Sequence, residues 1–155
     1  MRHHLAVLYR AYLDDIVVGR KTVECRLGKT GVPPHGLLRA GDLIWFKEVC
    51  GPVRVVARAR SVRRFTDLTP TMVDLIRQEW NREIRAPEAF WRARARGRAT
   101  SATLIWLGNV CPLRPFRIEK RNRRAWMVLA GPPIPGRPVV AGRETAAAGL
   151  QGSEA

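Results

Sequence analysis

The stretch GRKTVECR, residues 19–26, combines two patterns in one segment the length of a strand. Within it, two apolar residues alternate with Glu24 and Arg26, which is typical of a strand that has one apolar face and one polar face. Glu24 and Arg26 then project from the same face, about 6.6 Å apart along the strand. Lys21 stands just before the strand, where its ammonium can lean towards either face. The segment therefore predicts that a carboxylate, an ammonium and a guanidinium can converge.

Two interpretations of this trio are open. In the first, the three groups form a structural ion pair that closes the end of a barrel. In the second, they form a polar site in which Lys21 and Arg26 attract an anionic or carbonyl group, while Glu24 accepts or relays a proton. The second interpretation predicts that the trio opens onto one solvent-accessible cavity, with Val23 and Cys25 pointing into the core.

The rest of the chain predicts a small set of short elements around this strand. Apolar runs and alternating patterns predict five more strands, at residues 3–9, 43–46, 53–62, 102–110 and 124–129. In the strand at 53–62, one face carries Arg54, Arg58 and Arg60, and the other carries Val55, Ala57 and Ala59.

Helical spacing of apolar residues predicts a helix at 9–18, with Tyr9, Leu13, Ile16 and Val17 as its apolar stripe. A second helix is expected at 70–84, because Thr69 and Pro70 form a typical N-cap and first helical position. Pro87 is a candidate start for a short third helix.

About six strands with two or three helices favour an α+β domain built as a compact barrel or half-barrel. This domain is expected to cover residues 1–130. Residues 131–155 are rich in Pro, Gly and Ala and contain few large apolar side chains, so they are predicted to be a disordered tail. Removing that tail is expected to leave the thermal midpoint nearly unchanged.

The charge of the chain is strongly positive: 28 Lys and Arg against 13 Asp and Glu give a net charge of +15. A field of this sign favours polyanions, of which nucleic acid is the commonest in a cytosol. However, only four of the 28 basic residues are lysines. An excess of arginine is also what a GC-rich genome produces without any functional demand, and both explanations are open.

The three cysteines, Cys25, Cys50 and Cys111, lack the paired spacing of a zinc site or a disulfide framework. We expect reduced thiols in a cytoplasmic protein, with no metal and no cofactor. No apolar run approaches the ~20 residues that span a bilayer, and the first residues do not resemble a signal peptide. No membrane association is expected, and the sequence does not predict an oligomeric state.

The motif of residues 19–26 resembles the G-x-K-x-x-E-x-R motif of the ASCH (activating signal cointegrator homology) domains. Its four matching positions are Gly19, Lys21, Glu24 and Arg26. GDLIWF, residues 41–46, is similar to the G-D-x-I-x-F strand of that family, and residues 102–116 resemble the strand that closes its fold. The resemblance runs in order through residues 3–130.

The resemblance implies a PUA-like mixed β-barrel and binding of nucleic acid, mostly RNA, in a cleft that holds the Lys–Glu–Arg motif. It also implies a possible activity, because one small member of the family deacetylates N4-acetylcytidine and another is reported as a ribonuclease. The lysine of the amidohydrolase matches Lys21, and Glu79 is the nearest candidate for its catalytic glutamate. Its nucleophilic threonine falls on Glu24, so that nucleophile is missing here, and nearby Thr22 would have to substitute.

The function predicted from these observations is binding of RNA, another nucleic acid or a nucleotide-like ligand in a basic cleft. Lys21 and Arg26 are expected to contact phosphate or base oxygens, and Glu24 to fix them and to accept hydrogen bonds from the ligand. The loop KRNRR, residues 120–124, is expected to contact phosphate groups through Arg121, Arg123 and Arg124.

Two alternatives are kept. In a hydrolase that acts on a modified nucleoside or on RNA phosphodiesters, Lys21 would be the acid/base or electrostatic group and Glu24 the base. In a plain interaction module, the trio would serve only as an ion pair. Trp126 also has two interpretations, as a base-stacking side chain beside the basic loop or as the first core residue of the last strand.

Overall fold

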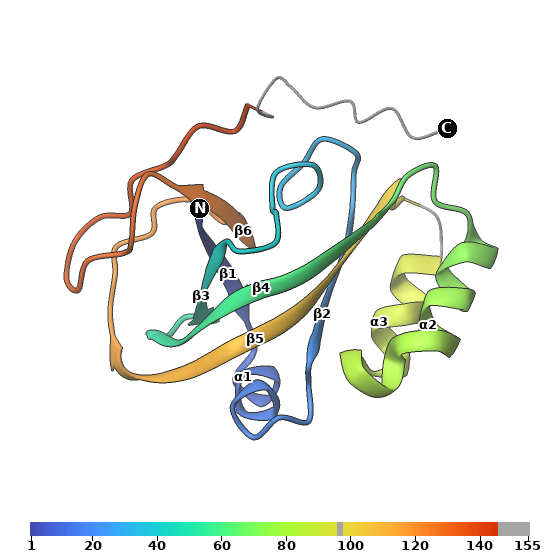
Figure 1. Cartoon of the computed structure of the whole chain (residues 1–155), viewed down its shortest axis with the longest axis horizontal. Helices are drawn as coiled ribbons and strands as arrows, with labels where there is room; N and C mark the ends of the chain where they lie inside the picture. Colours follow the sequence, from blue (N-terminus) through green and yellow to red (C-terminus); the bar gives the residue numbers. More distant parts are fainter. Residues whose placement is uncertain (96–97, 146–155) are drawn as a thin grey trace.

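Six strands form one mixed sheet in this computed structural model, which describes residues 1–95 and 98–145. The strands are β1 (His3–Leu8), β2 (Val23–Gly28), β3 (Leu43–Glu48), β4 (Val53–Phe65), β5 (Ser101–Phe116) and β6 (Trp126–Leu129). The helices are α1 (Arg10–Val17), α2 (Pro70–Ile84) and α3 (Glu88–Ala95). The predicted α+β fold, a small mixed half-barrel with three helices, is confirmed (Figure 1).

The sheet curls because its two longest strands are bent. Its order is β2-β5-β4-β3-β1-β6, and the antiparallel β4–β5 pair shifts register at three places. Such irregularities increase local twist and bend a strand. As a result β1 and β2, which are separated by three strands in the sheet, come close enough for Arg26 Nη2 to donate to the Val7 carbonyl at 3.2 Å. We call this junction between β1 and β2 the seam.

The apolar face of β2 packs against two helices. Val23 and Cys25 are buried with side chains of α2, α3 and β5, among them Ile76, Trp91 and Leu104. Figure 1 shows α2 and α3 side by side, next to β2 and the adjoining part of β5. Side chains of α1 and of every strand except β2 form a separate core cluster. Glu24 and Arg26 are therefore left on the face of β2 that looks towards the seam.

The predicted features of α2 and α1 agree with the structure to different degrees. In α2, the Thr69 side chain accepts a hydrogen bond from the Met72 N–H at 3.2 Å, so the predicted cap is confirmed. In α1, Leu13 is buried as expected, but Tyr9 is 67% exposed and Val17 42% exposed. The helix begins at Arg10, one residue after the predicted start, because Tyr9 is the extended residue before it.

The predicted tail differs from the structure in its first part. Residues 140–142 run back along β6: Ala130 N–H donates to the Val140 carbonyl at 3.0 Å, and Gly142 N–H donates to the Val128 carbonyl at 2.9 Å. The side chain of Glu144 pairs with Arg124 through two contacts of 2.8 and 3.1 Å. These backbone hydrogen bonds cover the outer edge of β6, which composition alone does not reveal. Residues 146–155 of the predicted tail lie outside the described residues.

Within the described part of the chain, none of the helices is long and apolar enough to cross a membrane.

The returning segment gives a first testable prediction. A chain that ends at Gly131 is expected to melt about 5 °C below a chain that ends at Thr145, because only the longer one keeps the cover of β6 and the Arg124–Glu144 ion pair. Thermal unfolding followed by circular dichroism measures the difference. Equal midpoints for the two chains would mean that residues 132–145 add nothing to stability.

Candidate functional site

A pocket of about 1030 Å³ lies at the seam. Its walls come from β1, β2, the loop that follows β2, the end of β3 and the segment between β5 and β6. Lys21, Glu24 and Arg26 all line it. The predicted convergence of the three groups on one cavity is therefore what the structure shows, although two of the three are almost wholly buried.

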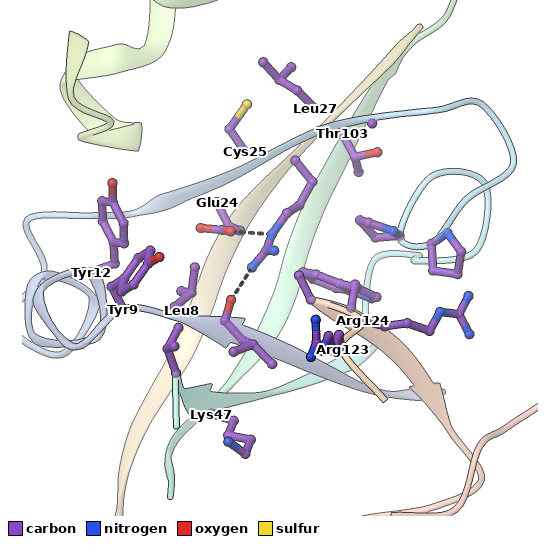
Figure 2. Close-up of a pocket in the computed structure, with 18 of the residues that line it drawn as sticks. Leu8, Tyr9, Tyr12, Glu24, Cys25, Leu27, Lys47, Thr103, Arg123 and Arg124 are labelled. Atoms are coloured by element: carbon purple, nitrogen blue, oxygen red, sulfur yellow. Dashed lines mark hydrogen bonds and ion pairs between the residues drawn. The ribbon is translucent and has the colours of Figure 1, made fainter. Parts of the chain in front are cut away.

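Glu24 is the centre of the trio and is 2% exposed. Its Oε1 accepts from Arg26 Nε at 2.7 Å, and its Oε2 lies 3.0 Å from Lys21 Nζ. Figure 2 shows the contact to Arg26 as a dashed line from Glu24. Burial acts to raise the pKa of Glu24, but the charges and hydrogen bonds of Lys21 and Arg26 outweigh it, so this pKa lies below its ordinary value. The group is thus a carboxylate at neutral pH.

Lys21 has no spare proton to offer a ligand. It is 4% exposed, and its ammonium donates to the carbonyls of Val23 at 3.0 Å and Ile84 at 2.7 Å besides pairing with Glu24. An ammonium has three protons, and these are three acceptors. Ile84 is the last residue of α2, where a positive charge is favoured by the helix dipole. Lys21 therefore fastens the start of β2 to the end of α2.

Arg26 is the member of the trio that keeps unused donors. It is half-buried, with Nε on Glu24 and Nη2 on the Val7 carbonyl. Its Nη1 has no hydrogen-bond partner among the residues that the structure describes. The guanidinium carbon lies 5.2 Å from the ring centroid of Trp126, within the range of a cation–π contact. Arg26 is thus held as a flat, charged surface at the wall of the pocket.

Trp126 packs against the guanidinium of Arg26 and is held in place by a hydrogen bond of its own. Its Nε1–H donates to Nδ1 of His4 at 3.1 Å, and Nε2 of His4 lies 3.1 Å from Asp42 Oδ2. Because Nδ1 accepts, the imidazole proton is assigned to Nε2, which donates to Asp42. Trp126 is only 4% exposed. The second interpretation of this residue, a core side chain of the last strand, therefore agrees with the structure.

Two tyrosines stand at the α1 side of the pocket. Tyr12 lies with its ring centroid 5.7 Å from Lys21 Nζ, and burial together with the Glu24 and Tyr9 charges raises its pKa. Tyr9, by contrast, exposes most of its ring. In Figure 2 both rings lie together on the side of Glu24 opposite Arg123 and Arg124. The pocket thus has an aromatic rim at one side.

Some of the other residues proposed from the sequence line the pocket, and others do not. Arg123 and Arg124 line the pocket, whereas Arg121 is exposed outside the described lining. Glu79 is exposed on α2 and also lies outside it. The arginines of β4 do not join the described lining either; Arg58, for example, donates to the Gly41 carbonyl.

Sequence reasoning did not single out Lys47 or Arg117, which both line the pocket. The available signal for Lys47 was its place directly after the apolar run 43–46, where the chain leaves the core. Arg117 has a similar signal at the end of the last long strand. Lys120 belongs to the predicted basic loop and also lines the pocket.

The charge of the pocket is unbalanced. As far as the described residues define the lining, Glu24 is its only carboxylate, against the seven cations Lys21, Arg26, Lys47, Arg117, Lys120, Arg123 and Arg124. In the same part of the chain, no three His, Cys, Asp or Glu residues are grouped to hold a metal ion. The arrangement therefore suits an anionic ligand.

The chain is similar in structure to the ASCH protein of Zymomonas mobilis. Against that protein the identity is 22% and the TM-score 0.58, over 74% of this chain and 72% of the other. A serine-to-alanine variant of it gives 21% and 0.65, over 83% and 88% of the two chains. Protein-family models and curated proteins give no match. The chain thus has an ASCH-like fold, as its sequence resemblance implies.

The buried trio predicts a stability effect at Glu24. Replacing it (Glu24→Gln) leaves the Lys21 ammonium buried without a counter-charge, so we expect a loss of about 3 kcal/mol at pH 7. Because the pKa of Glu24 is lower in the folded than in the unfolded chain, its stabilising effect is complete above its unfolded value and is lost as pH falls through the folded value. The difference in free energy of unfolding between the wild type and Glu24→Gln should therefore become smaller as the pH falls. Urea unfolding from pH 7 to pH 3 measures it.

A double-mutant cycle supplies the control. The double variant Lys21→Met with Glu24→Gln has no buried ammonium left without a counter-charge. Its loss in free energy of unfolding should therefore be smaller than the sum of the losses of the two single variants. If the losses of the two single variants add up to that of the double variant, or if the loss in Glu24→Gln does not change with pH, then Lys21 and Glu24 are not a tightly coupled buried pair.

Proposed function

We propose that the chain binds RNA or a nucleotide through the pocket at the seam. The observation that carries this proposal is Arg26: a planar guanidinium, fixed on three sides, with donors left over at the wall of a cationic pocket. A guanidinium plane can stack on a base and donate to base or phosphate oxygens at the same time. The ASCH-like fold agrees with this proposal.

In this proposal the three residues of the motif have different tasks. Arg26 touches the ligand. Glu24 and Lys21 are positioning residues, since their polar atoms are already engaged with each other and with main-chain carbonyls. Arg123, which is exposed and lines the pocket, adds attraction for phosphate groups, whereas Arg124 is paired with Glu144. The protein would bind its ligand in the cytoplasm, where the thiols of Cys25, Cys50 and Cys111 stay reduced.

Hydrolysis is less well supported by the geometry. A role as acid or base requires Lys21 or Glu24 to exchange a proton with the ligand, yet both are at most 4% exposed. Incubation of the pure protein with acylated nucleosides and short RNAs, followed by product analysis, tests this alternative. Turnover that disappears in Lys21→Met would favour the hydrolase over the binding module.

A charge-conserving variant tests the binding proposal. Arg26→Lys keeps a cation beside Glu24 but loses the planar, multiply donating group, so we expect affinity for a short single-stranded RNA to fall about tenfold. Affinity for heparin, a polyanion without bases, should change little. Fluorescence titrations at two salt concentrations measure both.

Arg121→Gln is the matched control, because Arg121 is basic and exposed outside the described lining. It should weaken both ligands alike and flatten the salt dependence by at most about one unit. If Arg26→Lys changed RNA and heparin binding in parallel, the proposal that this pocket binds RNA through Arg26 would be overturned.

A further inference from the structure

One end of the pocket is formed by four cations that come from separate parts of the chain. Lys47 is near the end of β3, Arg117 directly follows β5, and Lys120 and Arg123 lie in the loop before β6. We call these four residues the cationic end. In Figure 2, Lys47 and Arg123 are drawn on the β3 and β6 side of the pocket, away from Tyr12.

The two lysines of the cationic end are held by neutral oxygens only. Lys47 Nζ donates to the Glu48 carbonyl at 3.1 Å, and Lys120 Nζ donates to the carbonyl and side-chain oxygens of Asn122 at 2.7 and 3.0 Å. Both side chains are half-buried. The hydrogen bonds fix the two ammonium groups in place but leave their charges unneutralised.

The nearby carboxylates are engaged elsewhere. Glu48 pairs with Arg54 at 2.5 Å, and Glu144 pairs with Arg124 at 2.8 Å. Across the described part of the chain, no carboxylate lies within ion-pair distance of any residue of the cationic end. The pocket therefore ends in a set of positive charges without counter-charges.

Holding such charges together has a cost. Burial lowers the pKa of Lys47, and the charge of Arg117 acts in the same direction, whereas Cys50 and Glu48 act in the opposite direction without outweighing it. Burial with the nearby charges of Lys47 and Arg124 lowers the pKa of Lys120. Half-buried like charges destabilise a fold unless something compensates them. Glu24 is already matched by Lys21 and Arg26, so a bound anion would supply compensation that the described carboxylates do not supply to Lys47 and Lys120.

We propose that the cationic end is a phosphate subsite, which receives the terminal phosphate of a nucleotide while Arg26 contacts the base or sugar. This inference rests on the proposed function and narrows it to phosphorylated ligands. A terminal phosphate carries between one and a half and two negative charges near pH 7, whereas a phosphodiester carries one. Two fixed ammonium groups supported by two guanidinium groups match the more highly charged form.

The size of the pocket agrees with such a ligand. A volume of about 1030 Å³ is at the upper end of ordinary small-molecule sites, so a nucleotide fits within it. Terminal phosphates occur both on free mononucleotides and at the ends of RNA chains. The chemistry at the cationic end is the same in both cases, and the experiment below distinguishes them.

The experiment measures binding by isothermal titration calorimetry with the full chain. The probes are the four ribonucleoside 5′-monophosphates and their nucleosides, and an RNA trinucleotide with a phosphate at its 5′ end, at its 3′ end or at neither. The test variant is Lys47→Gln with Lys120→Gln. The matched control, Lys29→Gln with Arg114→Gln, removes two charges from exposed residues outside the described lining.

We expect a phosphorylated probe to bind the wild type at least about tenfold more tightly than its unphosphorylated counterpart. That preference should disappear in the test variant and remain in the control. A preference seen with mononucleotides identifies a small-molecule ligand, and one seen only with trinucleotides identifies an RNA end. Thermal midpoints of the variants, and the two single substitutions, show that a loss is not caused by unfolding.

Three results would overturn the inference. If phosphorylated and unphosphorylated probes bind equally while Arg26→Lys still weakens RNA binding, the subsite is wrong and the proposed function stands. If the preference survives in Lys47→Gln with Lys120→Gln, the phosphate is bound elsewhere. If no probe binds in an Arg26-dependent way, the proposed function fails together with the subsite.

Discussion

The arrangement at the seam depends on one buried carboxylate. Glu24 lies at an edge strand, 2% exposed, and burial alone would favour its neutral form. Its charge is retained because Lys21 and Arg26 sit on its two oxygens. Each of those cations then reaches a carbonyl in another element: Lys21 that of Ile84 in α2, and Arg26 that of Val7 in β1. Removing the carboxylate would leave two cations in a buried place and loosen both junctions. The ion pair therefore links three parts of the chain that do not pair in the sheet.

This constraint changes how the motif is understood. The structural ion pair and the ligand site are alternatives at the level of the sequence, and the proposed function assigns them to different residues. Lys21 and Glu24 take the structural task, since each is surrounded by protein partners. Arg26 alone has donors left, and the structure holds it rigidly, with Trp126, His4 and Asp42 behind it in a continuous chain of contacts. A fixed guanidinium loses little freedom when a ligand binds, which favours affinity.

Local patterns in the sequence predict the helices and strands, but they do not predict which of these elements come into contact. The alternation in residues 22–27 and the Thr69–Pro70 cap are local signals, and both appear in the structure. The helical period places Tyr9 in the stripe of α1, whereas in the structure Tyr9 is the extended residue before the helix and lines the pocket. Lys47 lines the pocket at a point where the β3–β4 pairing shifts register, between Phe46 and Lys47, and no short sequence pattern encodes that irregularity. Similarly, residues 140–142 cover β6 through backbone hydrogen bonds, which a composition rich in Pro and Gly does not indicate.

The net charge of +15 is also reinterpreted by the structure. A general excess of arginine, whether from genome composition or from function, predicts weak attraction to any polyanion. Many of these arginines are accounted for by partners: Arg54 by Glu48, Arg85 by Asp15 and Arg124 by Glu144. Lys47 and Lys120 are two of the four lysines in the chain, and both lie half-buried in the same pocket without a carboxylate in ion-pair range among the described residues. A genome that favours arginine does not explain lysines gathered at one place. Position and lack of a counter-charge, rather than total charge, are therefore what mark this end of the pocket as a place for an anion.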